Sequence, residues 1–162
     1  MIKKPQCVLQ QLVYSLAENQ KKHVRAELWK DHISGSPSVK TEHNSGPVLP
    51  DFRSYRQFRC LQTDRYSILL STGNNCILTT DATPVLVRNI LTSNGIVLMC
   101  EKFSTVEDDF TYPLPSSKLG IYKVCGQTAD LFAVPVSAFA RKCLLLPLDV
   151  HTDTFVVFPL LH

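Results

Sequence analysis

The sequence predicts a mostly β protein of the α+β class: a small, partly open antiparallel β-barrel of the SH3-like or BAH-like kind with an N-terminal helix. From residue 52 onward, short apolar runs recur at intervals of roughly 8–12 residues. Turn-forming Gly, Pro, Asn and Asp separate these runs. The 162 residues, 44% of them hydrophobic, suffice to bury one core. We expect three sections: a helical segment over 1–33, a flexible linker over 34–51 and a barrel-like module over 52–162.

The first section carries a helical pattern. Pro5 suits a first helical turn, and the apolar residues after it follow the i, i+3, i+4, i+7 rhythm of one buried face. The simplest interpretation is a helix that packs on the β module or on a partner. The alternative is an interaction helix inherited from a longer protein. The apolar face consists of Val8, Leu9, Leu12, Val13 and Leu16.

The second section lacks apolar periodicity. Residues 34–50 contain three prolines, two glycines and four serines. Apolar burial there cannot offset the entropy lost on ordering the chain. We therefore expect a flexible linker, in which His43 is solvated rather than a ligand.

The third section divides into strands. The pair Asn94-Gly95 is the strongest hairpin signal, because both residues tolerate the positive φ of a type I′ turn. The two runs that it joins are apolar on both faces, as expected of central strands covered on each side. The expected strands are Gln57–Leu61, Tyr66–Leu70, Cys76–Thr80, Val85–Leu91, Ile96–Phe103, Leu119–Val124, Leu131–Val134, Cys143–Leu146 and Thr154–Phe158.

Three further segments are less regular. Pro113 and Pro115 confine residues 110–114 to an edge strand or an irregular crossing. A short helix is expected over 137–142, capped by its first residue, Ser137. The apolar end, 155–162, should lie within the sheet.

Patterns for catalysis are weak. None of the five histidines lies in an expected strand or beside a Gly-bounded Ser or Cys. The six cysteines form no C-x-x-C pair, so we expect reduced, structural thiols. The acidic run 107–109 reads as a solvated turn, and no phosphate-binding glycine loop occurs. We therefore expect no enzyme, no cofactor and no metal site, with an unrecognised spatial site as a remote alternative.

Basic residues gather in the first part of the chain. Residues 1–65 carry eleven Lys and Arg against six Asp and Glu, whereas the rest carries six against eight. Interleaved arginines and aromatic rings can contact phosphates and stack on bases. An ordinary first strand with a charged outer face is the competing interpretation. The candidate nucleic-acid-binding residues are Arg53, Tyr55, Arg56, Phe58, Arg59 and Arg65.

Three segments carry a resemblance: Ser45-Gly-Pro47, the stretch 112–124 and the closing residues 155–162. Together they resemble the C-terminal region of long transposon-derived, transposase-like open reading frames in animal genomes. Residues 5–12 are similar to the helical stretch that precedes that region. The resemblance implies a tail module without a catalytic residue, one that touches nucleic acid or chromatin.

The leading hypothesis is a non-enzymatic module of transposon ancestry that binds a protein. A nucleic-acid-binding module that uses DNA or RNA as its partner is the alternative. No apolar stretch approaches the ~20 residues of a transmembrane helix, and residues 1–4 open no signal peptide. We therefore expect an intracellular protein without a membrane partner, with the nucleus as one candidate compartment.

Overall fold

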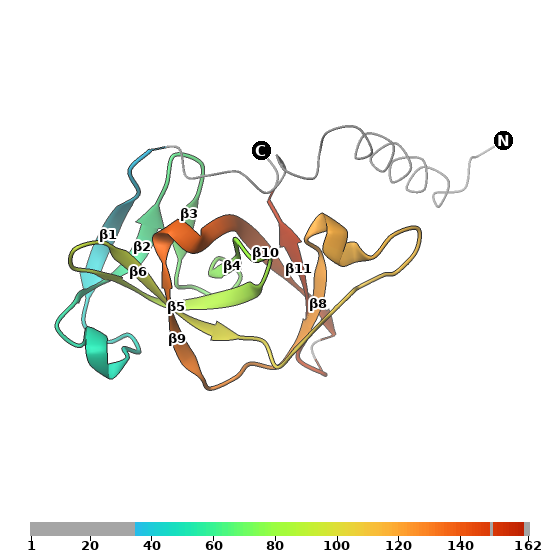
Figure 1. Cartoon of the computed structure of the whole chain (residues 1–162). Coiled ribbons are helices and arrows are strands. Elements are labelled where there is room, and N and C mark those ends of the chain that lie inside the picture. The colour runs from blue at the N-terminus through green and yellow to red at the C-terminus, as the bar shows by residue number, and fades with distance from the viewer. Residues whose placement is uncertain (1–34, 150, 161–162) are drawn as a thin grey trace.

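The computed structural model describes residues 35–149 and 151–160, so the helix expected over 1–33 lies outside the described residues. The described chain forms eleven antiparallel strands and three short 3-10 turns (Figure 1). The turns are η1 (Pro50–Phe52), η2 (Ser116–Leu119) and η3 (Val136–Ala138). The strands are β1 (Ser38–His43), β2 (Arg56–Gln62), β3 (Ser67–Leu69), β4 (Cys76–Thr79), β5 (Pro84–Thr92), β6 (Ile96–Lys102), β7 (Thr105–Glu107), β8 (Tyr122–Cys125), β9 (Leu131–Pro135), β10 (Phe139–Asp149) and β11 (Thr154–Pro159).

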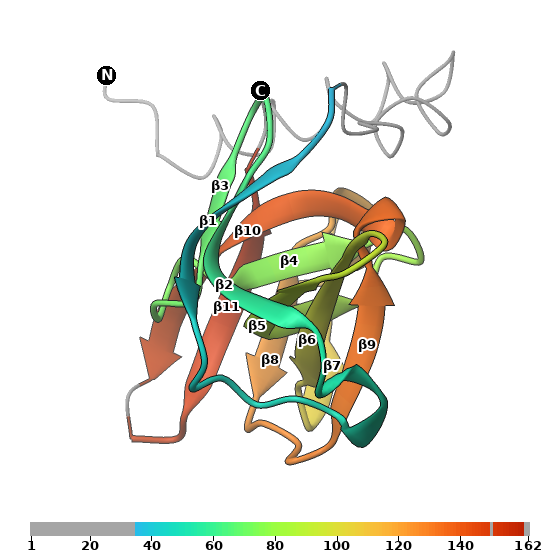
Figure 2. The same ribbon diagram turned by 90° about the vertical axis from the view of Figure 1, so that its left-hand side faces the viewer.

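The strands curl into a partly closed ring (Figure 2). The main path of hydrogen-bonded neighbours is β1-β2-β5-β4-β10-β11-β8-β7. β3 joins this path at β2, and β6 joins it at β5 and carries β9 on its other edge. Among the described strands, β9 pairs with β6 alone, so the ring is open beside β9. The prediction of a mostly β, antiparallel, partly open fold is confirmed at this level.

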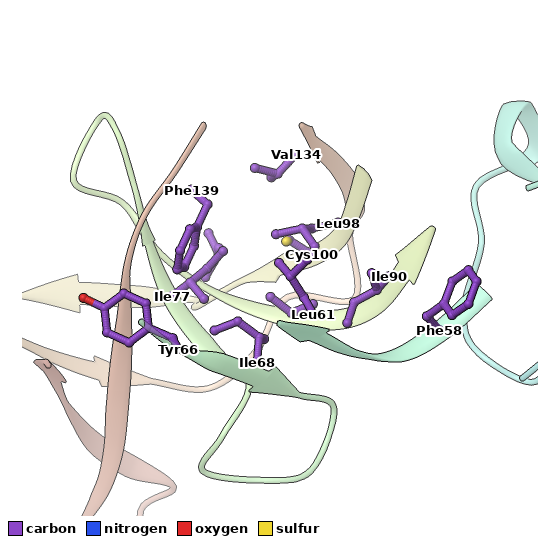
Figure 3. Packing of buried hydrophobic residues seen from close by; sticks show 12 residues of the cluster. Phe58, Leu61, Tyr66, Ile68, Ile77, Ile90, Leu98, Cys100, Val134 and Phe139 are labelled. Atoms are coloured by element: carbon purple, nitrogen blue, oxygen red, sulfur yellow. The ribbon is translucent and has the colours of Figure 1, made fainter. Parts of the chain in front are cut away.

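The ring encloses the larger of two apolar clusters. Side chains from β2, β3, β4, β5, β6, β9 and β10 converge on it (Figure 3). The rings of Tyr66 and Phe139 meet edge to face there, with their centroids 6.2 Å apart. Burying one Val, Leu or Ile side chain contributes roughly 1.5–3 kcal/mol. This cluster is therefore a main source of stability for the ring.

A second cluster lies on the opposite face of the sheet. In β5, Val85 and Val87 face the first cluster, whereas Leu86 faces the second. All four residues of β4 are likewise buried, because successive strand residues point to opposite faces. The prediction that 85–91 is a central strand covered on both sides is confirmed. The second cluster consists of Cys76, Leu78, Leu86, Phe103, Val124, Cys143 and Val157.

Part of the expected linker is a strand. β1 pairs with β2 from Ser38 opposite Gln62 to His43 opposite Gln57. The prediction of a flexible segment is wrong for these residues, because backbone hydrogen bonds to β2 supply the order that apolar burial does not. Outside the ladder, the Arg56 guanidinium donates from Nε and Nη2 to the Glu42 carboxylate, at 2.9 and 2.6 Å.

A buried amide fixes the loop that follows β1. The side chain of Asn89 is fully buried at an irregularity in the β5–β6 register. Its Nδ2 donates to the oxygens Pro47 O and Gln57 Oε1, at 3.2 and 2.8 Å. Its Oδ1 accepts from the next backbone amide, at 2.9 Å, and from His43 Nε2, at 3.1 Å. Every donor and acceptor of the amide is thus used. We call this arrangement of His43, Gly46, Pro47, Gln57 and Asn89 the Asn89 junction.

The Asn89 junction requires glycine at position 46, because any side chain there would collide with the Asn89 amide. A Cβ atom placed on this residue would lie 2.3 Å from Asn89 Nδ2. The Gly46 backbone amide also donates to Gln57 Oε1, at 3.0 Å. His43, expected to be solvated, is half-buried and part of the same network.

The helix expected over 137–142 is wrong. The 3-10 turn η3 ends at Ala138, and β10 begins at Phe139. Phe139 packs in the first cluster, and the residues 141–143 pair with β4. The Lys142 ammonium donates to Ser67 O, at 2.8 Å, which ties β10 to β3. Tertiary pairing overrides the local helical pattern here.

The hairpin at Asn94-Gly95 is confirmed, but its turn type is not. Three residues, 93–95, connect β5 to β6, and Ser93 N donates to Gly95 O at 3.2 Å. Neither Asn94 nor Gly95 has a positive φ, so the turn is not type I′. The closing pair is Thr92 opposite Ile96.

The acidic run 107–109 is more ordered than a solvated turn. Glu107 lies in β7, and Asp108 Oδ1 accepts from Ser117 N at 2.6 Å. The buried Ser116 hydroxyl donates to Ile121 O, at 2.9 Å. These bonds fold the irregular crossing expected around 110–114 back onto η2.

Candidate functional site

A cavity opens between β9 and the turn that joins β4 to β5. Its volume is about 410 Å³. The buried side chains of Val85 and Val134 belong to the first apolar cluster and form its floor. We call this cavity the β9 groove. Its lining residues are Thr79, Thr80, Asp81, Thr83, Val85, Lys102, Phe132, Ala133, Val134, Pro135 and Ala138.

One wall of the β9 groove is backbone. Four consecutive residues of β9, 132–135, line the groove, although alternate side chains of a strand point to opposite faces. The main chain of β9 therefore borders the cavity as well as its side chains. β6 occupies one edge of β9, from Val97 opposite Pro135 to Glu101 opposite Leu131. The other edge has no strand partner among the described residues.

The opposite wall is the turn between β4 and β5. Thr80 N donates to Ala138 O at 2.9 Å, which ties this turn to η3. The Thr79 hydroxyl donates to the Asp81 carboxylate. This hydrogen bond lowers the pKa of Asp81 below its usual value, against a weaker effect of burial. The groove therefore presents a carboxylate that stays ionised at neutral pH.

A cation and an aromatic ring stand together at the groove. The Lys102 ammonium lies over the Phe132 ring, 5.2 Å from its centroid. Such contacts stabilise by about 0.5–1 kcal/mol at exposed sites. The contact therefore favours one position of the Lys102 side chain, beside the opening of the groove. The groove thus combines an apolar floor, an anion on one wall and a cation on the other.

The sequence gives no signal for this groove. Its residues come from four separate stretches, 79–85, 102, 132–135 and 138. They meet only because β9 pairs with β6 and because η3, after β9, brings Ala138 to the turn that follows β4. None of them belongs to the candidate residues proposed from the sequence.

The structure divides the basic-aromatic candidates. Arg53 ends η1, whereas Arg65 lies in the turn after β2. A seven-residue strand separates them, which spans roughly 20 Å. Arg53, Arg59 and Arg65 are exposed, and Arg56 is exposed but paired with Glu42.

The aromatic candidates are turned inward. Phe58 is buried in the first cluster with the Arg56 guanidinium 5.4 Å from its ring centroid. Tyr55 is half-buried, and its ring meets the Phe52 ring edge to face. Phe58 and Leu61 are both buried although they lie three positions apart, because β2 changes partner from β5 to β3 between them. The candidates therefore form no single stacking platform.

The metal-ligating and thiol side chains of the described residues can be surveyed directly. Among them, no three His, Cys, Asp or Glu side chains are placed to hold a metal ion. The five described cysteines are free thiols. Burial raises the pKa of Cys100 to about 12, and a hydrogen bond between the Cys76 and Cys143 thiols together with burial raises the pKa of Cys76. Both thiols are therefore neutral and poorly nucleophilic at pH 7.

No described helix is long and apolar enough to cross a bilayer. No curated protein and no solved structure matches the chain. Residues 42–160, from the end of β1 to the residue after β11, match the family described as "Domain of unknown function (DUF8592)". This range takes in the Asn89 junction and the β9 groove. The chain belongs to the DUF8592 family.

Proposed function

We propose that this protein is a non-enzymatic module that binds a partner protein by adding an extended segment of that partner to β9. The free edge of β9 beside a 410 Å³ cavity is the observation that carries the proposal. Peptides bind exposed sheet edges in this way, with main-chain hydrogen bonds for affinity and side-chain pockets for specificity. An unpaired edge is otherwise a liability that natural sheets cover or blunt.

The groove indicates the kind of segment that fits. An added strand would direct every second side chain toward the floor at Val85 and Val134, which favours an apolar residue there. The ionised Asp81 on the facing wall favours a lysine or arginine nearby in the segment. A partner segment of alternating apolar and polar residues with one basic residue meets both conditions.

An array of acetylated, amidated ten-residue peptides tests the proposal. All peptides alternate apolar and polar residues, and the central polar residue is Lys, Glu or Gln. We expect the Lys series to bind best at 150 mM salt, as measured by fluorescence anisotropy. Amide shifts on titration should concentrate at 131–135 and 79–83. Failure of the whole array to bind, or shifts centred away from β9, would contradict the proposal.

Two variants separate the groove from other surfaces. Thr80→Arg places a long side chain at the groove from an exposed position and keeps the Thr80 backbone amide that donates to Ala138 O. It should weaken binding at least tenfold with the melting temperature nearly unchanged. The matched control Val106→Arg adds the same side chain to an exposed position of β7 and should leave binding unaffected.

Fluorescence anisotropy also tests the nucleic-acid alternative, with an oligonucleotide in place of the peptide. The arginines Arg53, Arg59 and Arg65 are exposed, but the aromatic candidates do not form a platform with them. A labelled single-stranded 20-mer should therefore bind weakly, with no preference over heparin. Tight binding that falls steeply with salt would favour nucleic acid as the partner instead.

The finer expectations from the sequence belong with this proposal. The short antiparallel strands and partly closed ring support an SH3-like or BAH-like barrel, a kind of fold that holds peptides on its surface. An intracellular location, the nucleus included, and descent from a transposon-derived reading frame stay predictions. Finding the bound partner by its segment would test the location, since the partner's compartment must match.

A further inference from the structure

A second surface is left uncovered on β10 and β11. Leu144, Leu146 and Phe158 have exposed fractions of 37%, 48% and 42%. Phe158 lies opposite Leu144 in the ladder, and the half-buried Val156 lies opposite Leu146. Cross-strand neighbours share a face, so these four side chains form one apolar patch. We call it the β10–β11 face.

The patch lies on the face of β10 and β11 that points away from the second cluster. Cys143 and Val157 point the other way, into the second cluster, and Leu145 and Phe155 pack against that cluster. Alternation therefore places the residues between them on the other face, beyond the edge of the first cluster. Leu148, 56% exposed, extends the apolar surface at the register shift near the end of β10. Adjoining apolar side chains on a sheet face indicate an interaction surface rather than scattered exposure.

We infer that the β10–β11 face is covered by the chain's own residues 8–16. In the sequence, the apolar residues of this segment follow the spacing of one helical face: Val8, Leu9, Leu12, Val13 and Leu16. An amphipathic helix needs an apolar surface to be stable, because helices of this length are marginal alone in water. The β10–β11 face is the complementary surface: apolar at its centre, with Lys142 at one end and the ion pair of Lys123 and Glu107 at one side.

The chain enters the described structure next to this face. Ser38 pairs with Gln62, Gln62 pairs with Ser67, and Ser67 O accepts from Lys142 Nζ. Lys142 precedes Leu144 on the same side of β10. Figures 1 and 2 both place the start of β1 and the end of β11 at the same end of the molecule. The residues between 16 and 35 can span roughly 60 Å when extended, far more than needed.

Tethering favours this occupant over a separate molecule. A segment in the same chain as the surface it binds reaches that surface at an effective concentration in the millimolar range. A second copy of the chain at micromolar concentration competes poorly against it. The inference concerns a different surface from the β9 groove, so either can fail without the other.

Methyl-labelled NMR of the full chain tests the inference. We expect cross-peaks between the methyl groups of residues 8–16 and those of Leu144, Leu146 and Val156. Leu12→Asp should shift the methyl signals of the β10–β11 face and lower the melting temperature by about 4 °C. The matched control Gln11→Asp adds the same charge off the apolar stripe and should do neither.

Two outcomes would overturn the inference. One is the absence of such cross-peaks together with equal effects of Leu12→Asp and Gln11→Asp. The other is a concentration-dependent dimer of the unmodified chain in sedimentation, with contacts between the two β10–β11 faces, since a second copy would then be the occupant.

Discussion

The Asn89 junction and the β9 edge are two places where regular strand pairing is interrupted. They differ in whether other hydrogen bonds replace the missing backbone pairs. At the junction, the side chain of Asn89 binds four partners and leaves no polar atom of its amide unused. At β9, one edge of the backbone has no strand partner among the described residues. Buried polar groups must be satisfied, whereas an edge open to water or to a ligand need not be. At Asn89, side-chain hydrogen bonds replace the backbone bonds that the irregular β5–β6 ladder leaves unmade. No such replacement is present on the open edge of β9 among the described strands, which makes this edge a candidate for binding.

The largest effect is expected at the junction. Gly46→Ala places a Cβ atom where Asn89 Nδ2 now lies, so the amide must leave its partners. We expect a loss of about 3 kcal/mol in the free energy of unfolding, measured by urea denaturation. Gly95→Ala is the control, because a Cβ atom there meets nothing within 4 Å and φ is not positive. Equal losses of stability for the two substitutions would contradict the claim that contact with Asn89 makes glycine necessary at position 46.

A smaller effect is expected at the groove. Asp81→Asn removes the charge that favours a basic residue in the bound segment. We expect about threefold weaker binding of the Lys peptide and no change for the Gln peptide, because Asp81 is largely exposed to solvent. Since the pKa of Asp81 is lowered from 3.8, the preference for Lys should persist down to about pH 4 and fade only below it. Loss of the preference near pH 6 would exclude Asp81 as its source.

A third prediction compares the pH dependence of two backbone amides: the Ser117 amide, bound to Asp108, and the Ile90 amide, bound to Asn89. The backbone amide of Ser117 holds the pKa of Asp108 below its usual value of 3.8. A lowered pKa in the folded state stabilises the protein above the unfolded pKa, and this contribution disappears as pH falls through the folded one. Below about pH 4, the Ser117 amide should therefore lose protection from hydrogen exchange. The Ile90 amide, bound to the non-titrating Asn89, should keep its protection.

The smallest effect is expected from the ion pair between β1 and β2. The Glu42 carboxylate and the Arg56 guanidinium are both well exposed, so water screens their attraction. Glu42→Gln should leave the melting temperature almost unchanged in thermal denaturation. A large decrease would mean that this ion pair, rather than the ladder, orders β1.

The sequence predicted the strands whose own residues carry the signal. The runs 76–80, 85–91 and 96–103 begin and end within one residue of β4, β5 and β6. Their apolar residues are buried in the two clusters, which is why the pattern is visible in the sequence. β1 was missed because its order comes from pairing with β2 and leaves little apolar pattern. The start of β10 was mistaken for a helix because its pairing with β4 is invisible along the chain.

The candidate site was beyond the reach of the sequence for a similar reason. The β9 groove is a property of where the ring stays open, and Asp81, Lys102 and Phe132 meet there through topology alone. The basic-aromatic stretch was visible as a pattern. Its aromatic members proved to be partly core residues, with Phe58 buried and Tyr55 packed on Phe52.

Native-state hydrogen exchange on the full chain, with and without a saturating Lys peptide, tests the open edge most directly. In the free protein, alternate amides of residues 131–134 should exchange rapidly, while the Ile90 amide stays protected. Adding the peptide should slow the exchange of those β9 amides and leave Ile90 unchanged. Uniform protection along β9 in the free protein, or no slowing on addition of a peptide that binds, would contradict strand addition at β9.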